Sequence, residues 1–342
     1  MAAKKFPSEL RMDIVSNDWV VIATGRARRP ETFKKEKRIR KETPKKDCPF
    51  CNVVDQEKPS LIIVNGEKVG SWKEIPKNWT TIVFPNKYPA FIDGVEDTNE
   101  RFEGPLYKVM NAVGFHEVVV TKDHKKQIAD FKPEQVKELF DAYQERYLDM
   151  MNERHVNHIS IFHNHGPSAG ASIAHPHSQI ITTPLIDTDL RGALGNAEHY
   201  FRDHQKCVYC EMNEWEKRSG QRIVFENEDF LVVCPFASKT AFQVIVTPKK
   251  HLPYFERITE KEKWGLAEAF QTTIKKIHKA LNDPDYNFYL HTAPCDGKNH
   301  EYYHWHWTIL PKTSTWAGFE IGTRMEISTI EPEKAAEYLR KQ

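Results

Sequence analysis

The sequence contains one pattern twice, and this duplication constrains the fold more than any other feature. Each half has a Cys-x-x-Cys pair, a β-branched segment that ends in a histidine, a segment of helical period, and a closing segment with alternate histidines. The corresponding residues are Cys48, Cys51, His124 and His175 in the first half, and Cys207, Cys210, His251 and His304 in the second. The two histidines of each half are 51 and 53 residues apart. This agreement in order, residue type and spacing indicates two similar units fused in one chain.

Each unit is expected to contain strands, one long helix and further strands. The first long helix is expected to begin at Pro133, and the second at a capping box formed by Thr259 and Glu262. Strands and helices do not alternate strictly along the chain, which favours an α+β fold with mostly antiparallel sheets and packed helices. We expect the first unit to span residues 1–190 and the second to span residues 191–342.

Length and charge narrow the class of protein. The 342 residues are enough for about two domains, and the net charge of +1 gives no general attraction to nucleic acid or membranes. The basic stretch Lys34–Lys46 is interpreted as a solvated loop. No apolar run is long enough to span a membrane, and the first residues lack the apolar core of a signal peptide. We therefore expect a cytoplasmic protein with no nucleic-acid or membrane partner.

The duplicated cysteine pairs predict metal sites. In a reducing compartment such pairs are usually metal ligands or redox motifs rather than parts of a disulfide framework, and their duplication together with both histidines favours metal. A structural zinc takes four cysteine or histidine ligands, and each unit supplies two of each kind. The sequence thus predicts two zinc ions per chain, one held by Cys48, Cys51, His124 and His175 and the other by Cys207, Cys210, His251 and His304. The second half also holds four histidines within sixteen residues: His291, His300, His304 and His306. Three of these with a carboxylate could hold iron or zinc instead, so the composition of the second site stays open.

The closing segment of the first unit carries the candidate nucleophile. Residues two apart on a strand face the same side, so His177 is expected beside the metal ligand His175. A neutral imidazole held in this way is a competent nucleophile toward phosphorus, and Gln179 can hydrogen-bond a phosphoryl oxygen. In the second unit Trp307 and Thr308 replace Ser178 and Gln179. That unit is therefore expected to have kept its fold and metal while lacking the reactive site.

The whole chain resembles the galactose-1-phosphate uridylyltransferase family, a two-unit branch of the histidine-triad superfamily. The most specific motif is His-Pro-His-x-Gln at residues 175–179. Residues 19–30 are similar to the N-terminal signature of the family, and Ala317–Glu320 are similar to its C-terminal signature. The resemblance implies two histidine-triad-like units, with the catalytic site and a zinc site in the first.

The resemblance also implies roles for individual residues. His177 would be the nucleophile that takes the nucleotidyl group, and Gln179 would contact the transferred phosphoryl group. The implied substrate-binding residues are Arg26 and Arg29 near the phosphates, Asn164 and Ser172 at the nucleotide diphosphate, Phe84 and Asn86 in the nucleoside pocket, and Phe319 and Glu320 at the sugar. Because the last two would reach into the site of a neighbouring subunit, a homodimer with shared active sites is expected.

The expected activity is transfer of a uridylyl group from UDP-glucose to galactose 1-phosphate or a related hexose 1-phosphate, through a covalent nucleotidyl-histidine. Lys87, Ser314 and Glu326 depart from the pattern of the best-known members. The second Cys-x-x-Cys pair looks more like a branch that includes ADP-glucose phosphorylase. An ADP-sugar phosphorylase or adenylyltransferase is therefore the alternative within the family. The alternative from another class is a non-catalytic, zinc-containing nucleotide-binding protein.

Overall fold

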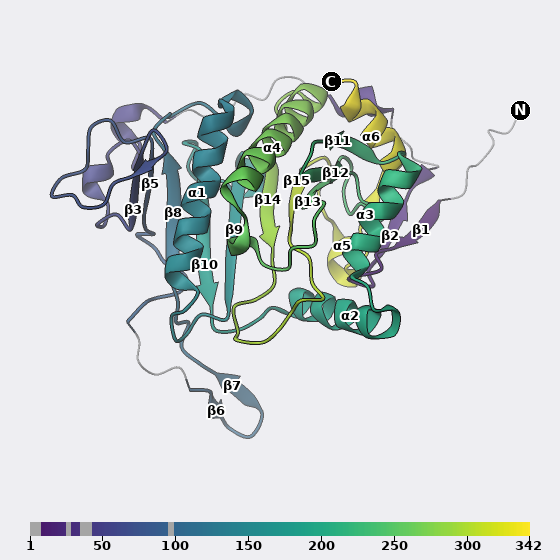
Figure 1. The fold of residues 1–342 in the computed structure, drawn as a ribbon, viewed down its shortest axis with the longest axis horizontal. Coiled ribbons are helices and arrows are strands. Elements are labelled where there is room, and N and C mark those ends of the chain that lie inside the picture. Colours follow the sequence, from purple (N-terminus) through teal and green to yellow (C-terminus); the bar gives the residue numbers. More distant parts are fainter. Residues whose placement is uncertain (1–7, 25–28, 35–42, 95–98) are drawn as a thin grey trace, which may run out of the picture.

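The computed structural model describes residues 8–24, 29–34, 43–94 and 99–342. Arg26 and most of the basic stretch Lys34–Lys46 lie outside the described residues. The predicted α+β fold is confirmed, because helices pack on a sheet whose ladders are all antiparallel (Figure 1). None of the described helices is both long enough and apolar enough to cross a bilayer.

A single eleven-stranded sheet runs through both units. From one edge to the other its strands are β11 (Ile223–Glu226), β12 (Phe230–Val233), β13 (Val244–Pro248), β15 (His306–Pro311), β14 (Tyr286–His291), β9 (His158–His165), β10 (His177–Thr183), β8 (His116–Thr121), β5 (Thr81–Pro85), β3 (Leu61–Val64) and β4 (Glu67–Lys68). Corresponding strands of the two units follow the same order from the centre of the sheet to its edges: β9, β10, β8, β5 and β3 in the first unit, and β14, β15, β13, β12 and β11 in the second. The units meet where β9 pairs with β14, and Asn164 lies opposite Asn287 in that ladder. The duplication seen in the sequence is thus a duplication across one continuous sheet.

Two long helices cover one face of this sheet and pack against each other: α1 (Pro133–Met150) and α4 (Glu260–Leu281) (Figure 1). Both begin where the sequence predicts. At α4, the Thr259 hydroxyl accepts a hydrogen bond from the Glu262 amide, and the Glu262 carboxylate accepts one from the Thr259 amide. Such a cap stabilises a helix by about 1 kcal/mol. Buried aromatic rings from helices and sheet, among them Phe140, Phe270 and Trp307, meet edge to face in the core.

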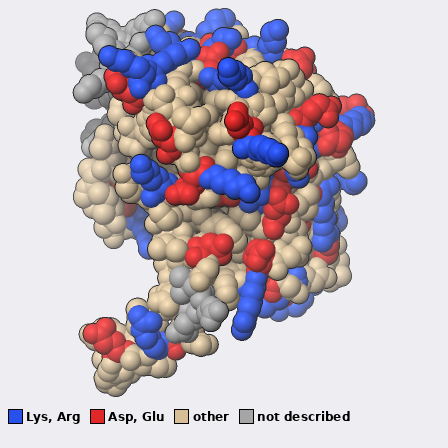
Figure 2. Space-filling model, turned by 90° about the vertical axis from the view of Figure 1, so that its left-hand side faces the viewer, with Lys and Arg blue, Asp and Glu red and all other residues tan. Residues whose placement is uncertain are grey.

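Smaller elements complete the described part of the chain. They are the helices α2 (Thr188–His204), α3 (Val208–Ser219), α5 (Gly318–Thr323) and α6 (Pro332–Arg340), the sheet of β1 (Glu9–Met12), β2 (Trp19–Ile22) and β16 (Ile327–Ser328), and the hairpin of β6 (Arg101–Glu103) and β7 (Tyr107–Val109). Short 3-10 helices are η2 (Pro30–Phe33), η3 (Lys45–Asp47), η4 (Val53–Asp55), η5 (Ile128–Asp130), η6 (Pro167–Ala169) and η7 (Phe255–Arg257). The hairpin projects from the body, and Figure 2 shows acidic and basic side chains interspersed on the face seen there. The division expected at residue 190 falls within α2 and stays a proposal.

The closing strand of each unit begins later than expected. The prediction that these strands start at His175 and His304 is wrong by two residues, because β10 starts at His177 and β15 at His306. Pro176 has no amide proton to donate to a ladder. In the second unit the Trp305 amide donates to the Leu252 carbonyl, outside the sheet. The first histidine of each pair therefore precedes the strand.

Candidate functional site

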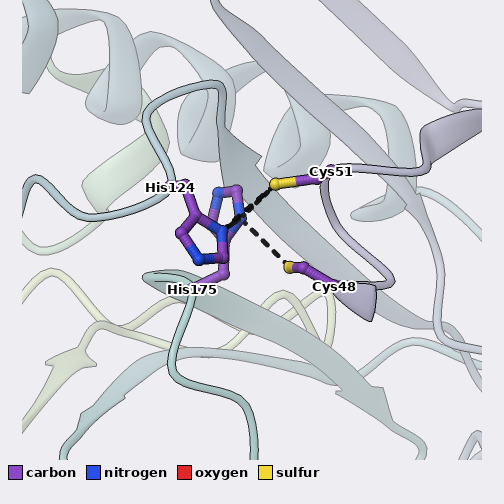
Figure 3. Close-up of side chains that lie close together, drawn as sticks. All are labelled: Cys48, Cys51, His124 and His175. Atoms are coloured by element: carbon purple, nitrogen blue, oxygen red, sulfur yellow. Dashed lines mark hydrogen bonds between the residues drawn. The ribbon is translucent and has the colours of Figure 1, made fainter. Parts of the chain in front are cut away.

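The structure brings the four predicted ligands of the first unit together (Figure 3). Cys51 Sγ lies 3.1 Å from His124 Nδ1, and Cys48 Sγ lies 3.5 Å from His175 Nδ1. The two Nδ1 atoms are 3.3 Å apart. Bonds of 2.0–2.3 Å in a tetrahedral zinc site place its ligand atoms about 3.3–3.8 Å apart. The spacing and chemistry of this group therefore fit a zinc ion.

The backbone around this first cluster sets which nitrogen of each ring faces inward. His124 Nε2 lies 2.8 Å from the Thr43 carbonyl, and His175 Nε2 lies 2.7 Å from the Thr121 carbonyl. A carbonyl oxygen only accepts, so Nε2 carries the proton in both rings. Each Nδ1 lone pair is thereby left for a metal, as is usual for histidine ligands oriented by an outer hydrogen bond.

The second unit repeats this geometry with Cys207, Cys210, His251 and His304. Cys210 Sγ lies 3.4 Å and 3.5 Å from the Nδ1 atoms of the two histidines. Their Nε2 atoms again face backbone carbonyls, those of Glu301 and Pro248. The alternative ligands group differently, since His291 stacks on His306 and His300 pairs with Asp296. Each unit thus contains a Cys₂His₂ cluster that could hold a metal ion.

His177 lies at the start of β10, directly after the first cluster. Its Nδ1 donates a hydrogen bond of 2.9 Å to the His175 carbonyl. Nδ1 therefore carries the proton, and the lone pair is on Nε2. The ring is 9% exposed and packs at 4.8 Å from the Phe50 ring. Burial lowers the pKa of His177 below its usual value, which favours the neutral imidazole. The predicted nucleophile thus has a fixed tautomer with a free nitrogen.

Gln179 lies two residues along β10 and is held by His116, a residue that the sequence reasoning missed. The Ala90 amide donates to His116 Nδ1 at 3.0 Å, so the proton of that ring is on Nε2. Nε2 then donates to Gln179 Oε1 at 2.8 Å. This bond fixes the amide of Gln179 and leaves its NH₂ group for another partner. His116 and Val118 are two residues apart on β8 and face the same side, and Val118 is paired with Gln179. This alternation is the sequence signal that could have pointed to His116.

The two residues expected in the nucleoside pocket lie on or beside β5. Phe84 is opposite Val118, which is opposite Gln179, so Phe84 and Gln179 share a face of the sheet. Phe84 is 1% exposed and belongs to the apolar cluster around Phe50. Asn86 follows the strand, with its Nδ2 atom 3.1 Å from His116 Nε2. Both residues therefore lie around the His116–Gln179 pair.

Asn164 reaches the same face from β9. Phe162 pairs with Gln179 across the β9–β10 ladder, and Asn164 is two residues further along. Asn164 thus shares the face of His177 and Gln179. The loop after it contains Ser172, which is exposed. Of the two residues expected at the diphosphate, Asn164 is therefore beside the predicted nucleophile in the sheet.

For Arg29, Phe319 and Glu320 the described part of the chain shows no contact with His177, and Arg26 lies outside the described residues. Arg29 is exposed and directly precedes η2, where its carbonyl accepts a hydrogen bond from the Thr32 hydroxyl. Phe319 and Glu320 lie on α5, which Figure 1 shows well apart from β10. Phe319 and Ile321, both on α5, are 49% and 69% exposed.

The second unit retains a degenerate copy of the reactive strand. His306 Nδ1 lies 3.3 Å from the His304 carbonyl, as in the first unit, and burial lowers the pKa of His306 to about 4. Thr308 stands where Gln179 stands in the first unit, and Trp307 is fully buried. His306 lines a cavity of about 1440 Å³ beneath α2 and α3.

Comparisons with known proteins show relatives that match the chain over both units. The family model for the N-terminal domain of galactose-1-phosphate uridyl transferase matches residues 2–186, and the model for its C-terminal domain matches residues 193–341. An ADP-glucose phosphorylase from Arabidopsis thaliana is 32% identical, over 97% of this chain and 92% of that protein. A galactose-1-phosphate uridylyltransferase from Thermotoga maritima is 26% identical, over 97% of this chain and 98% of that protein.

Solved structures extend the similarity. An Arabidopsis thaliana ADP-glucose phosphorylase with bound ADP-glucose superposes with a TM-score of 0.81, at 28% identity over 98% of this chain and 99% of the other. The structure of a uridylyltransferase superposes with a TM-score of 0.74, at 24% identity over 97% of each chain, and supports the fold alone. The matches extend over both units. The chain therefore belongs to the galactose-1-phosphate uridyl transferase family, whose members are nucleotidyltransferases.

Proposed function

We propose that the chain moves a nucleoside monophosphate from a nucleotide sugar to a phosphate-bearing acceptor through a covalent bond to His177. One observation carries this proposal. The Nδ1 proton of His177 is tied to the His175 carbonyl, so a lone pair on Nε2 is available on the face that carries Gln179 and Asn164. That arrangement is suited to attack on phosphorus.

The chemistry balances in two displacements. His177 Nε2 attacks the α-phosphorus of the nucleotide sugar, an N–P bond forms, and the bond from that phosphorus to the bridging oxygen breaks. The sugar 1-phosphate leaves with the bonding electrons. A phosphate oxygen of the acceptor then attacks the same phosphorus, and the imidazole leaves with its lone pair. Because Nε2 is unprotonated at the start, neither displacement requires a proton transfer at that atom.

The neighbouring residues supply orientation and charge balance. The NH₂ group of Gln179 is available to a phosphoryl oxygen because its Oε1 is bound to His116. Asn164 is placed to contact the same group of phosphates. Arg26 and Arg29 are proposed to balance the phosphate charge, and Ser172 to contact the diphosphate. Phe84 and Asn86 are proposed to contact the nucleoside.

The two Cys₂His₂ clusters are proposed to hold one zinc ion each. Zinc bound by four protein ligands is structural, since no position is left open for substrate. In the first cluster His175 would be fixed as a ligand, and its carbonyl would then hold the His177 ring in place. The residues of the second cluster would fix the start of α3 to the loop before β15.

Two donor and acceptor pairs are candidates. Transfer from UDP-glucose to galactose 1-phosphate or a related hexose 1-phosphate is the first, because both family models that match the chain are of galactose-1-phosphate uridyl transferase. Reaction of ADP-glucose with phosphate, or adenylyl transfer, is the second. The 32% identity to an ADP-glucose phosphorylase favours it, as does the second Cys-x-x-Cys pair.

We further propose a homodimer in which α5 completes the active site of the partner. Within one chain α5, which carries Phe319 and Glu320, is well apart from β10, the strand that begins at His177 (Figure 1). The exposed apolar side chains of Trp316, Phe319 and Ile321 are consistent with burial against a second copy.

Initial-rate kinetics test the proposed activity. The two candidate reactions are run across a grid of donor and acceptor concentrations, and the expected result is parallel double-reciprocal lines for one pair. A higher kcat/KM for UDP-glucose selects the first candidate, and a higher value for ADP-glucose selects the second. Binding of both nucleotide sugars without any turnover would instead indicate a non-catalytic nucleotide-binding protein.

A further inference from the structure

A strand of the second unit contacts the loop that follows Asn164 in the first unit. We propose that Asp285 and Asn287 are positioning residues that shape this loop, Gly166–Ser172, for the phosphates of the nucleotide sugar. The inference rests on the proposed function and extends it. It assigns the second unit, which lacks the reactive glutamine, a part in positioning the substrate of the first.

The amide of Asn287 sets the orientation of Asn164. Asn287 Nδ2 donates to Asn164 Oδ1 at 2.7 Å and to the Ala169 carbonyl at 2.8 Å. Because Asn164 Oδ1 accepts this bond, its Nδ2 group lies on the other side of the amide, toward Gly170. Asn164 is on the same face of the sheet as His177, and it turns its N–H donors, rather than its oxygen, toward the loop at Gly170. Donors are what an anionic phosphate requires.

The carboxylate of Asp285 fixes the beginning of the same loop. Asp285 is 1% exposed, and its Oδ2 accepts a hydrogen bond of 2.8 Å from the Ser168 amide. Gly166 has φ of +81°, and a Cβ placed there would lie 2.0 Å from Asp285 Oδ1. The loop backbone is thus packed directly against a buried carboxylate of the other unit.

These contacts join the two units at the nucleophile. Asn287 pairs with Asn164 in the ladder between β14 and β9, and Asn164 is on the face of His177 and Gln179. If β14 carried apolar side chains here, Asn164 could turn its oxygen toward the phosphates and the turn at η6 would lose its support. These contacts, together with the shared sheet, give the second unit a role although it lacks the reactive glutamine.

The test is the variant Asn287→Leu, which removes both donors at similar volume and adds no charge. The single-turnover rate of nucleotidyl transfer to His177 is expected to fall roughly 10- to 100-fold, as for a buried acceptor that has lost its partner. In an Asn164→Ala background the same change should cost clearly less than in the wild type, because the part of its effect that passes through Asn164 is already lost while the bond to the Ala169 carbonyl remains to be removed. A merely structural role would give losses that multiply in the double variant.

The matched control is Asn227→Leu. Asn227 also donates two hydrogen bonds from Nδ2, to the Gly265 carbonyl and the Glu268 carboxylate, in the turn between β11 and β12 at the far edge of the sheet. Its rate of nucleotidyl transfer should equal that of the wild type. A wild-type rate in Asn287→Leu, or multiplying losses in the double variant, would overturn the proposal.

Hydrogen exchange makes the test independent of activity. Amides of residues 166–172 should exchange faster in Asn287→Leu than in the wild type or Asn227→Leu. Unchanged exchange in this segment would overturn the proposal even if turnover falls. If the wild type transfers no nucleotide to His177 while exchange changes as expected, the proposed function fails and the structural contact stands.

Discussion

Replacing Gly166 with alanine should destabilise the protein more than the same change at Gly170, although both glycines lie in one loop. Both have positive φ, +81° and +89°. Gly170, with ψ of 11°, is in the left-handed region, where alanine costs about 1–2 kcal/mol. Gly166, with ψ of 160°, is in a region that essentially only glycine adopts, where alanine costs about 1–3 kcal/mol. A Cβ at Gly166 would also lie 2.0 Å from Asp285 Oδ1, whereas a Cβ at Gly170 would meet nothing nearer than Asn164 Nδ2 at 3.8 Å.

The clash between a Cβ at residue 166 and Asp285 adds to the stability that Gly166→Ala loses relative to Gly170→Ala. Asp285 is buried and bound to the Ser168 amide, so it cannot move aside without losing that bond. Overpacking of a buried site costs about 1–3 kcal/mol more. The Gly166→Ala variant should therefore lose about 2–6 kcal/mol of unfolding free energy, and Gly170→Ala about 1–2 kcal/mol.

Urea denaturation followed by tryptophan fluorescence measures both variants against the wild type. The expected order of midpoints is wild type, then Gly170→Ala, then Gly166→Ala. Adding Asp285→Ala to Gly166→Ala removes the clash and should recover part of the loss. Equal midpoints for the two alanine variants would refute the reasoning, because the carboxylate would then not restrict the loop.

Three further outcomes are expected. Cys207→Ser should lower the zinc content of chelator-free protein from about two ions to one per chain and keep nucleotidyl transfer, because the second cluster is structural; unchanged content by elemental analysis would contradict this. His116→Ala should reduce kcat roughly 5- to 30-fold by freeing Gln179, and should add little in a Gln179→Ala background; a full further loss there would contradict an effect through Gln179. Mixing inactive His177→Asn with inactive Glu320→Ala should restore some turnover through mixed dimers; a fully active monomer by sedimentation would rule out shared sites.

The internal duplication made much of the fold predictable. Paired cysteines, β-branched segments and helical stripes recur at matching spacing, and they placed the starts of α1 and α4 correctly. Helix caps and apolar periodicity are local signals, so one sequence is sufficient to read them. The junction between β9 and β14 was not predicted, because edge-to-edge pairing of two units leaves no local signature.

The duplication also made part of the candidate site predictable. The Cys₂His₂ groups are brought together as expected, since their ligand types and spacing recur in both units. His116, Asp285 and Asn287 were missed because each acts through a neighbour that is distant in sequence. The strand expected to include His175 begins two residues later, at His177, because Pro176 has no amide proton to donate to a ladder.

The central claim is the covalent bond between His177 and the nucleotide, and intact-mass measurement tests it most directly. Wild-type protein and His177→Asn are each mixed with UDP-glucose or ADP-glucose alone, quenched rapidly under alkaline conditions, and weighed. The account predicts one added uridylyl or adenylyl group on the wild type, located to the peptide that contains His177, and none on the variant. Absence of an adduct on an active wild type, with kinetics that require donor and acceptor bound together, would contradict it.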